Sequence, residues 1–119
     1  MRNLVISKPW GKYIILSQGF NYIVKKIIIE PNQQLSLQLH NNRSEHWTVI
    51  NGECLVILGG DEPRLLKSNE HIYIPKKVKH RIINQSEDMA EILEIQYGLC
   101  DEEDIVRFED NYGRVDTNI

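Results

Sequence analysis

The chain is poor in cysteine and lacks long hydrophobic runs, and each shortage excludes a class of protein. Its 119 residues contain two cysteines, Cys54 and Cys100, which are too few for the disulfide framework of a small secreted domain. Cys54 lies in an apolar run, so a reduced and buried thiol is expected there. No stretch approaches the ~20 apolar residues that span a bilayer, and the apolar part of residues 1–7 is too short for a signal peptide. We therefore expect a cytoplasmic protein that does not contact a membrane.

An excess of positive charge is also missing. The formal net charge is −3, which argues against the broad basic surface of a nucleic-acid-binding protein. Neither a G-x-G-x-x-G sequence nor a P-loop is present, so the nucleotide-binding sites that depend on them are not expected. There is no linker, internal repeat or low-complexity segment, and the length fits one domain, residues 1–119, with a single core.

What the sequence does contain is a series of short β segments. Runs rich in Ile, Val, Leu and Tyr recur about every ten residues between turn formers, and Asn51-Gly52 is the strongest hairpin signal. The pattern predicts an all-β, single-domain fold, either a barrel or a double-sheet jelly roll. For residues 101–108, which begin with acidic side chains, it predicts a short helical turn or a clasp. The predicted strands are 13–16, 22–30, 35–40, 46–50, 54–58, 71–74, 80–83 and 92–97.

Side chains that can bind a metal ion are spaced along these strands. Alternation places Ser36, Gln38 and His40 on one face of the third predicted strand. Glu45 follows a polar turn, after which a returning strand brings it back to that side, and His80 arrives from a distant strand. Buried polar groups need partners, either one another or a metal ion, and the combined spacing favours a metal. One amide, two imidazoles and one carboxylate without thiolate suit Zn²⁺, Mn²⁺, Fe²⁺ or Co²⁺.

The spacing resembles the two-part signature of the cupin superfamily, usually G-x5-H-x-H-x4-E-x6-G followed by G-x5-P-x-G-x2-H-x3-N. Gln38 stands where the first histidine is usual, which is typical of the phosphomannose isomerases within the superfamily. Asn32, Asn69 and Lys77 replace three glycines of the signature. The resemblance implies a cupin jelly-roll barrel with the metal inside. The matching positions are His40, Glu45, Gly52, Pro75, His80 and Asn84.

Further segments resemble the type II mannose-6-phosphate isomerase domain, which often forms the C-terminal part of bifunctional enzymes with mannose-1-phosphate guanylyltransferase. The resemblance extends over residues 7–114 and implies a zinc-dependent isomerase. Asn42 replaces a histidine common in the family, a change expected at the rim rather than among the ligands. The chain has no room for a guanylyltransferase domain, so synthesis of GDP-mannose is not expected. The segments are 8–13, 35–40, 43–47 and 107–114, and the implied metal ligands are Gln38, His40, Glu45 and His80.

The implied reaction interconverts mannose 6-phosphate and fructose 6-phosphate through an enediolate, whose charge a metal ion stabilises. Its substrate is a phosphorylated hexose, and guanidinium groups suit the phosphate. Alternation turns His46 away from Glu45, so the candidates for proton transfer are Glu109, Asp110 and, on the resemblance alone, Lys12. Segment 107–114 can instead be a structural clasp, and each arginine an ordinary surface charge. The phosphate-binding candidates are Arg43, Lys79, Arg81, Arg107 and Arg114, of which Arg43 and Arg114 lie in matching segments.

Two other functions stay open at this point. A sugar-binding or regulatory cupin without turnover is permitted by the replaced glycines. A metal-dependent oxygenase is a weaker alternative, because oxygenase cupins more often have histidine at the position of Gln38.

An apolar strand face and an apolar N-terminal segment predict self-association. Leu35, Leu37 and Leu39 share one face, and residues 4–6 are Leu, Val and Ile. A small barrel leaves such surfaces exposed unless a partner covers them. We expect a homodimer in which residues 1–6 contact the partner subunit.

Overall fold

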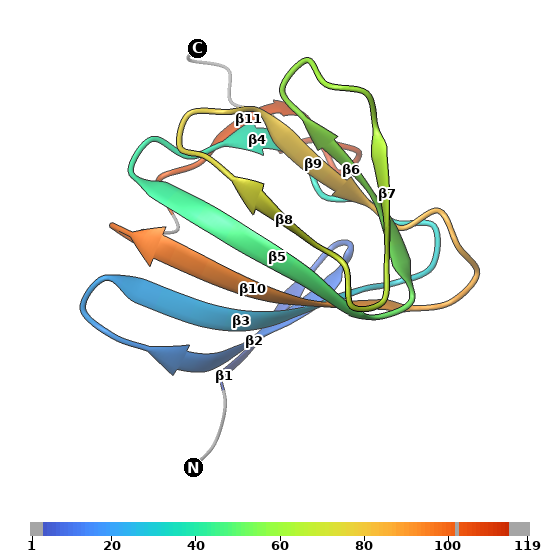
Figure 1. Ribbon diagram of the computed structural model, residues 1–119, viewed down its shortest axis with the longest axis horizontal. Helices are drawn as coiled ribbons and strands as arrows, with labels where there is room; N and C mark the ends of the chain where they lie inside the picture. The colour runs from blue at the N-terminus through green and yellow to red at the C-terminus, as the bar shows by residue number, and fades with distance from the viewer. Residues whose placement is uncertain (1–3, 102, 115–119) are drawn as a thin grey trace.

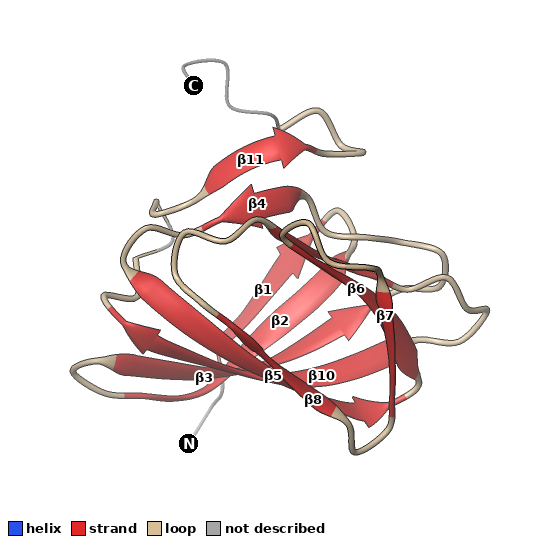
Figure 2. Ribbon diagram, turned by 45° about the horizontal axis from the view of Figure 1, so that its top comes forward, coloured by secondary structure: helices blue, strands red, loops and turns tan. Residues whose placement is uncertain are grey.

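The described chain forms two antiparallel β-sheets. The computed structural model describes residues 4–101 and 103–114, and these residues form eleven strands and no helix (Figure 1, Figure 2). The larger sheet has the order β1-β2-β3-β10-β5-β8 and the smaller one the order β11-β4-β9-β6-β7. The strands are β1 (Leu4–Lys8), β2 (Gly11–Gln18), β3 (Tyr22–Ile29), β4 (Leu37–Leu39), β5 (Arg43–Asn51), β6 (Glu53–Leu58), β7 (Arg64–Lys67), β8 (His71–Ile74), β9 (His80–Ile83), β10 (Ala90–Gly98) and β11 (Val106–Glu109).

The core lies between the two sheets, because alternation turns one face of each strand inward. Trp47 on β5 is the largest fully buried side chain, with 2% of its surface exposed. Figure 2 shows the smaller sheet lying over the larger one. This is the all-β double-sheet architecture that the sequence predicts. The other buried apolar residues are Trp10, Tyr13, Ile27, Ile29, Val49, Cys54, Val56, Leu66, Ile72, Ile74, Ile82, Ala90 and Ile92.

All eight predicted strands overlap observed ones, and residues 71–74 and 80–83 coincide with β8 and β9. The pattern does not reveal β1, β7 or β11. The helical turn expected within residues 101–108 is wrong, because the described residues of this segment contain no helix. The Asp104 N–H donates to the Asp101 carbonyl oxygen at 3.0 Å, and the chain continues as β11, which pairs with β4 and forms the alternative, a clasp. Since no described residue is helical, this part of the chain has no helix that could cross a membrane. The expected contact of residues 1–3 with a partner lies outside the described residues.

Among the described residues, three non-glycine residues adopt the left-handed backbone conformation. They are Asn32 (φ 59°), Asn69 (φ 74°) and Lys77 (φ 63°), and they occupy the three positions where the cupin signature has glycine. The turns have therefore kept a glycine-like backbone although the glycines are replaced. Asparagine tolerates this conformation because its short side chain can hydrogen-bond locally, whereas lysine has no such compensation.

Replacing Lys77 by glycine should therefore stabilise the protein. The left-handed backbone costs a lysine roughly 1–2 kcal/mol, and the greater freedom of glycine in the unfolded chain offsets part of the relief. We expect the free energy of unfolding to rise by about 0.5–1 kcal/mol, measured by urea denaturation. Lys76→Gly is the matched control, because Lys76 is exposed in the same turn without a positive φ. Equal destabilisation by both substitutions would contradict the prediction.

Candidate metal centre

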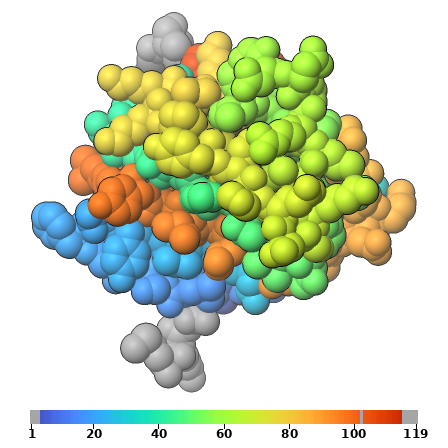
Figure 3. Space-filling model, viewed as in Figure 1, coloured from blue at the N-terminus to red at the C-terminus, as the bar shows by residue number. Residues whose placement is uncertain are grey.

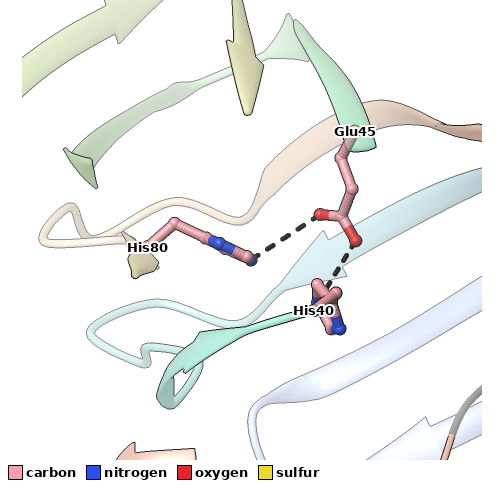
Figure 4. A group of neighbouring side chains, drawn as sticks. All are labelled: His40, Glu45 and His80. Carbon is pink, nitrogen blue, oxygen red and sulfur yellow. Dashed lines mark ion pairs between the residues drawn. The ribbon is translucent and has the colours of Figure 1, made fainter. Parts of the chain in front are cut away.

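Three buried side chains converge between the two sheets (Figure 4). His40 follows β4, Glu45 lies on β5 and His80 begins β9. The His40 Nε2 atom is 3.3 Å from Glu45 Oε2, and the His80 Nε2 atom is 3.8 Å from Glu45 Oε1. One ligand atom from each residue can be chosen so that all three lie within 4.8 Å of one another. Residues from three separate segments of the chain thus form one compact set of donors.

The backbone orients both imidazoles for metal binding. His40 Nδ1–H donates to the carbonyl oxygen of Asp104 at 2.6 Å, and His80 Nδ1–H donates to that of Val78 at 2.9 Å. Each Nε2 atom is therefore the unprotonated nitrogen and lies near Glu45, the arrangement usual for metal-binding histidines. His80 Nε2 is buried without a hydrogen-bond partner among the described residues. A metal ion would satisfy this atom, so the donor set fits a divalent cation.

The protonation states also suit a metal. Burial, and next the positive charge of Arg43, lower the pKa of His40 to about 4, and burial lowers the pKa of His80. Both imidazoles are then neutral near pH 7, and only the neutral ring offers a lone pair.

Gln38 lies beside these donors. Its Oε1 atom accepts a hydrogen bond from the Ser36 hydroxyl at 2.8 Å, and its Nε2 atom is 3.5 Å from His40 Nε2. Exchanging the amide oxygen and nitrogen by a side-chain flip would present the oxygen, the atom that binds metals, to the same place. The structure thus brings all four predicted ligands together.

A layer of hydrogen bonds surrounds the carboxylate of Glu45. Arg43 Nε donates to Glu45 Oε2 at 3.0 Å, and Arg43 Nη2 is 3.1 Å from His40 Nε2. Trp47 Nε1–H is shared between Glu45 Oε1 at 3.0 Å and Glu94 Oε2 at 3.1 Å. Glu94 also accepts a hydrogen bond from Gln96 at 2.7 Å. Burial, and next the charge of Glu45, raise the pKa of Glu94 to about 7.

A strongly cationic cavity adjoins Gln38, one of the four donors, and Arg43, which contacts His40 and Glu45. It encloses about 500 Å³ including its open mouth, and Gln38 and Arg43 form part of its wall. Glu94 is the single carboxylate among the described residues that line it. A cavity of this composition suits a small anionic ligand. The basic residues that line it are Lys8, Lys25, Arg43, Arg107 and Arg114.

Of the predicted phosphate-binding residues, Arg43, Arg107 and Arg114 line this cavity. Arg81 does not line the cavity. Its guanidinium donates hydrogen bonds to the carbonyl oxygens of Leu35 at 3.0 Å and Glu109 at 2.9 Å. These bonds tie the clasp to the smaller sheet. The side chain of Lys79 lies over the Phe108 ring, 4.1 Å from its centroid.

The residues predicted for proton transfer lie at the edge of the site or outside it. Asp110 binds the guanidinium of Arg114 through both carboxylate oxygens, at 2.8 and 3.2 Å. Glu109 is largely exposed and pairs with Arg81 at 3.6 Å. Lys12 is exposed and adjoins Tyr13, which points inward on the same strand. None of these three side chains is part of the cavity wall.

Sequence reasoning missed several residues of the cavity wall, and strand alternation contained the signal for two of them. Lys25 lies on the same inward face of β3 as Ile27 and Ile29, and the residue is 3% exposed. Glu94 lies on the same inward face of β10 as Ile92. A charged residue in phase with a buried apolar face is costly unless it has a partner or a function. The missed residues with ionisable or amide side chains are Lys8, Lys25, Glu94 and Gln96.

Comparison with known proteins assigns the chain to a family. Residues 2–110 match the family model described as mannose-6-phosphate isomerase C-terminal. The chain belongs to this family. It is 42% identical over 111 residues to mannose-1-phosphate guanylyltransferase ManC of Salmonella typhimurium, and 44% identical over 110 residues to the xanthan biosynthesis protein XanB of Xanthomonas campestris pv. campestris. Each match covers 92% of this chain and 23% of the relative, so the chain spans about a quarter of the length of these curated relatives.

Solved structures confirm the cupin fold. The capsular polysaccharide assembling protein CapF from Staphylococcus aureus superposes with a TM-score of 0.79 at 17% identity, over 91% of this chain and 34% of CapF. The Schizosaccharomyces pombe Cnp3 cupin domain superposes with a TM-score of 0.69 at 9% identity, over 73% of this chain and 64% of that domain. At such identities the likeness concerns the fold alone.

Proposed function

We propose that the protein is a metal-dependent aldose–ketose isomerase that interconverts mannose 6-phosphate and fructose 6-phosphate. One observation carries the proposal: a buried cluster of metal donors, two imidazoles and a carboxylate, lies beside Gln38 and Arg43, which line a cavity with five basic residues in its wall. The donors suit a metal that binds the sugar oxygens, and the basic wall suits the phosphate. Membership of the isomerase family supports the choice of reaction.

Gln38, His40, Glu45 and His80 would hold the ion, with Zn²⁺ as the first candidate and Mn²⁺, Fe²⁺ or Co²⁺ as alternatives. When bound, the metal supplies Lewis-acid stabilisation of the enediolate oxygens. The hydrogen bonds from Arg43 and Trp47 keep the Glu45 carboxylate in place. The other cationic residues of the cavity would hold the substrate phosphate at a fixed distance from the metal donors.

The reaction takes a proton from C2 of the aldose and delivers one to C1, while the O2 hydroxyl proton is transferred to O1. A carboxylate suits this transfer. We propose Glu94 as the first candidate because it lines the cavity. Asp110 and Glu109 are the alternatives on the clasp, where Asp110 holds the cavity residue Arg114. Lys12, exposed beside the inward-pointing Tyr13, is the least favoured.

The activity can be tested directly on metal-reconstituted protein. We expect it to form fructose 6-phosphate from mannose 6-phosphate in a coupled assay. EDTA should abolish the activity and added Zn²⁺ should restore it, because the metal stabilises the charge of the intermediate. Other hexose phosphates serve as comparison substrates. If fully metal-loaded protein turns over no phosphosugar but binds one, the protein is a sugar-binding module.

We also propose a homodimer in a reducing, cytoplasmic compartment. Leu4 and Val5 on the edge strand β1 are 57% and 53% exposed, and an exposed apolar edge favours pairing with a second copy. Both cysteines are free thiols, as expected where disulfides do not form. Light scattering that gives the 13.9 kDa mass of one chain at micromolar concentration would contradict the dimer.

A further inference from the structure

The four histidines of the chain form two pairs on opposite sides of the larger sheet. His40 and His80 are the buried pair of the metal centre, with ring centroids 5.2 Å apart. His46 and His71 are the second pair, with ring centroids 5.1 Å apart, and both are exposed. The His46 Nε2 atom is 3.0 Å from the His71 Nδ1 atom. The proposed isomerase reaction uses neither residue of this outer pair.

Strand pairing produces the outer pair. Strands β5 and β8 are antiparallel, with His46 opposite Tyr73 and Thr48 opposite His71. The two histidines are therefore diagonal neighbours on the outward face. Figure 3 shows this face, with the green of β5 between the yellow of β8 and the orange of β10. The Tyr73 ring meets His46 edge-on, with centroids 6.4 Å apart and planes at 72°, which restricts the orientation of the imidazole.

We propose that His46 and His71 form a second metal site, for Cu²⁺ or Ni²⁺. Two nitrogens that each bind one ion at ~2.1 Å are about 3.0 Å apart at a right angle and about 3.4 Å apart at the tetrahedral angle. The observed separation is 3.0 Å, at which the two imidazoles hydrogen-bond to each other, and the same separation suits adjacent positions of a square-planar or octahedral ion that replaces the shared proton. Copper(II) and nickel(II) prefer these geometries and bind imidazole strongly, whereas zinc prefers the tetrahedral one.

The surroundings of the pair support an open site. Because both rings are exposed, the side chains have room to rotate, which would break their hydrogen bond and direct both lone pairs at one ion, with water at the remaining positions. The proposed site consists of two imidazoles, whereas the inner centre also includes the carboxylate of Glu45. The two sites should therefore differ in the metal they prefer, and the inference stands whether or not the protein is an isomerase.

The test compares Cu²⁺ binding by wild type, His46→Gln, His71→Gln and Thr48→Ala. Each protein is first loaded with Zn²⁺ and desalted, so that any exchange at the inner centre is common to all four. Thr48 shares the outward face with the pair and is the matched control. Titration calorimetry measures affinity, and electron paramagnetic resonance counts the nitrogen donors of the copper.

Wild type and Thr48→Ala should bind one extra Cu²⁺ with a two-nitrogen spectrum. Each histidine substitution should weaken this binding at least ~10-fold, since loss of one of two donors removes the chelate. Equal affinity and spectra in all four proteins would overturn the proposal. Loss in only one of the two histidine variants would also overturn it, because it would show binding by a single imidazole.

Discussion

Replacing His80 by alanine should remove the metal ion proposed for the inner centre and, with it, the proposed isomerase activity. His80 supplies one of two imidazoles in the donor set, and its Nε2 atom has no other partner among the described residues. Loss even of a group that only supports a metal ligand typically weakens binding 10–100-fold. Loss of a ligand itself should weaken it at least ~100-fold. Elemental analysis of desalted protein should show about one equivalent of metal in wild type and little in the variant.

His71→Ala is the matched control for this experiment, because it removes an exposed histidine from β8, the strand that pairs with β5. Desalted His71→Ala should keep the inner ion and its activity. Circular dichroism should establish that His80→Ala is folded, since the substitution also empties a buried position. Equal metal content in wild type and His80→Ala would show that the ion does not bind through His80.

The convergence of the four candidate ligands could be predicted from the sequence because their spacing follows strand alternation and a recurrent signature. Strand alternation fixes the common direction of Gln38 and His40, and the spacing to Glu45 and His80 matches a recurrent signature. The backbone at one position of a signature glycine also shows what the sequence does not determine locally. At Lys77 the residue changed while the backbone conformation persisted (φ 63°), so the turn is set by the surrounding strands as well as by its own sequence.

The cavity wall could be predicted only in part, because it depends on which strands lie opposite each other. Lys8 comes from β1 and Arg107 from β11, two strands that the pattern did not reveal. Strand β11 pairs with β4, where Val106 lies opposite Leu39, and such distant pairing has no local signal. Arg81 shows the converse: its sequence position suggests phosphate binding, but its guanidinium binds backbone carbonyls that only the folded chain brings within reach.

Replacing Arg114 by alanine should weaken the use of mannose 6-phosphate far more than the binding of mannose. Arg114 lines the cavity, and Asp110 holds its guanidinium by hydrogen bonds of 2.8 and 3.2 Å. A charge-assisted contact to phosphate contributes ~1.5–3 kcal/mol. The ratio kcat/KM for mannose 6-phosphate should therefore fall ~10–150-fold. Arg43 is a poorer choice for this test, because it also contacts Glu45 and His40 and its loss would disturb the metal donors.

Two comparisons separate phosphate binding from a structural role of Arg114. Arg64→Ala removes an exposed charge on β7, outside the cavity, and should leave kcat/KM unchanged. Asp110→Asn keeps the Arg114 guanidinium but weakens the hydrogen bonds that position it. It should therefore lower kcat/KM for mannose 6-phosphate less than Arg114→Ala does. Calorimetric affinities for phosphorylated and unphosphorylated mannose complete the test. If Arg114→Ala weakens both sugars equally, Arg114 shapes the cavity without contacting the phosphate. A selective loss for the phosphorylated sugar would identify the clasp as the part of the fold that recognises the substrate phosphate.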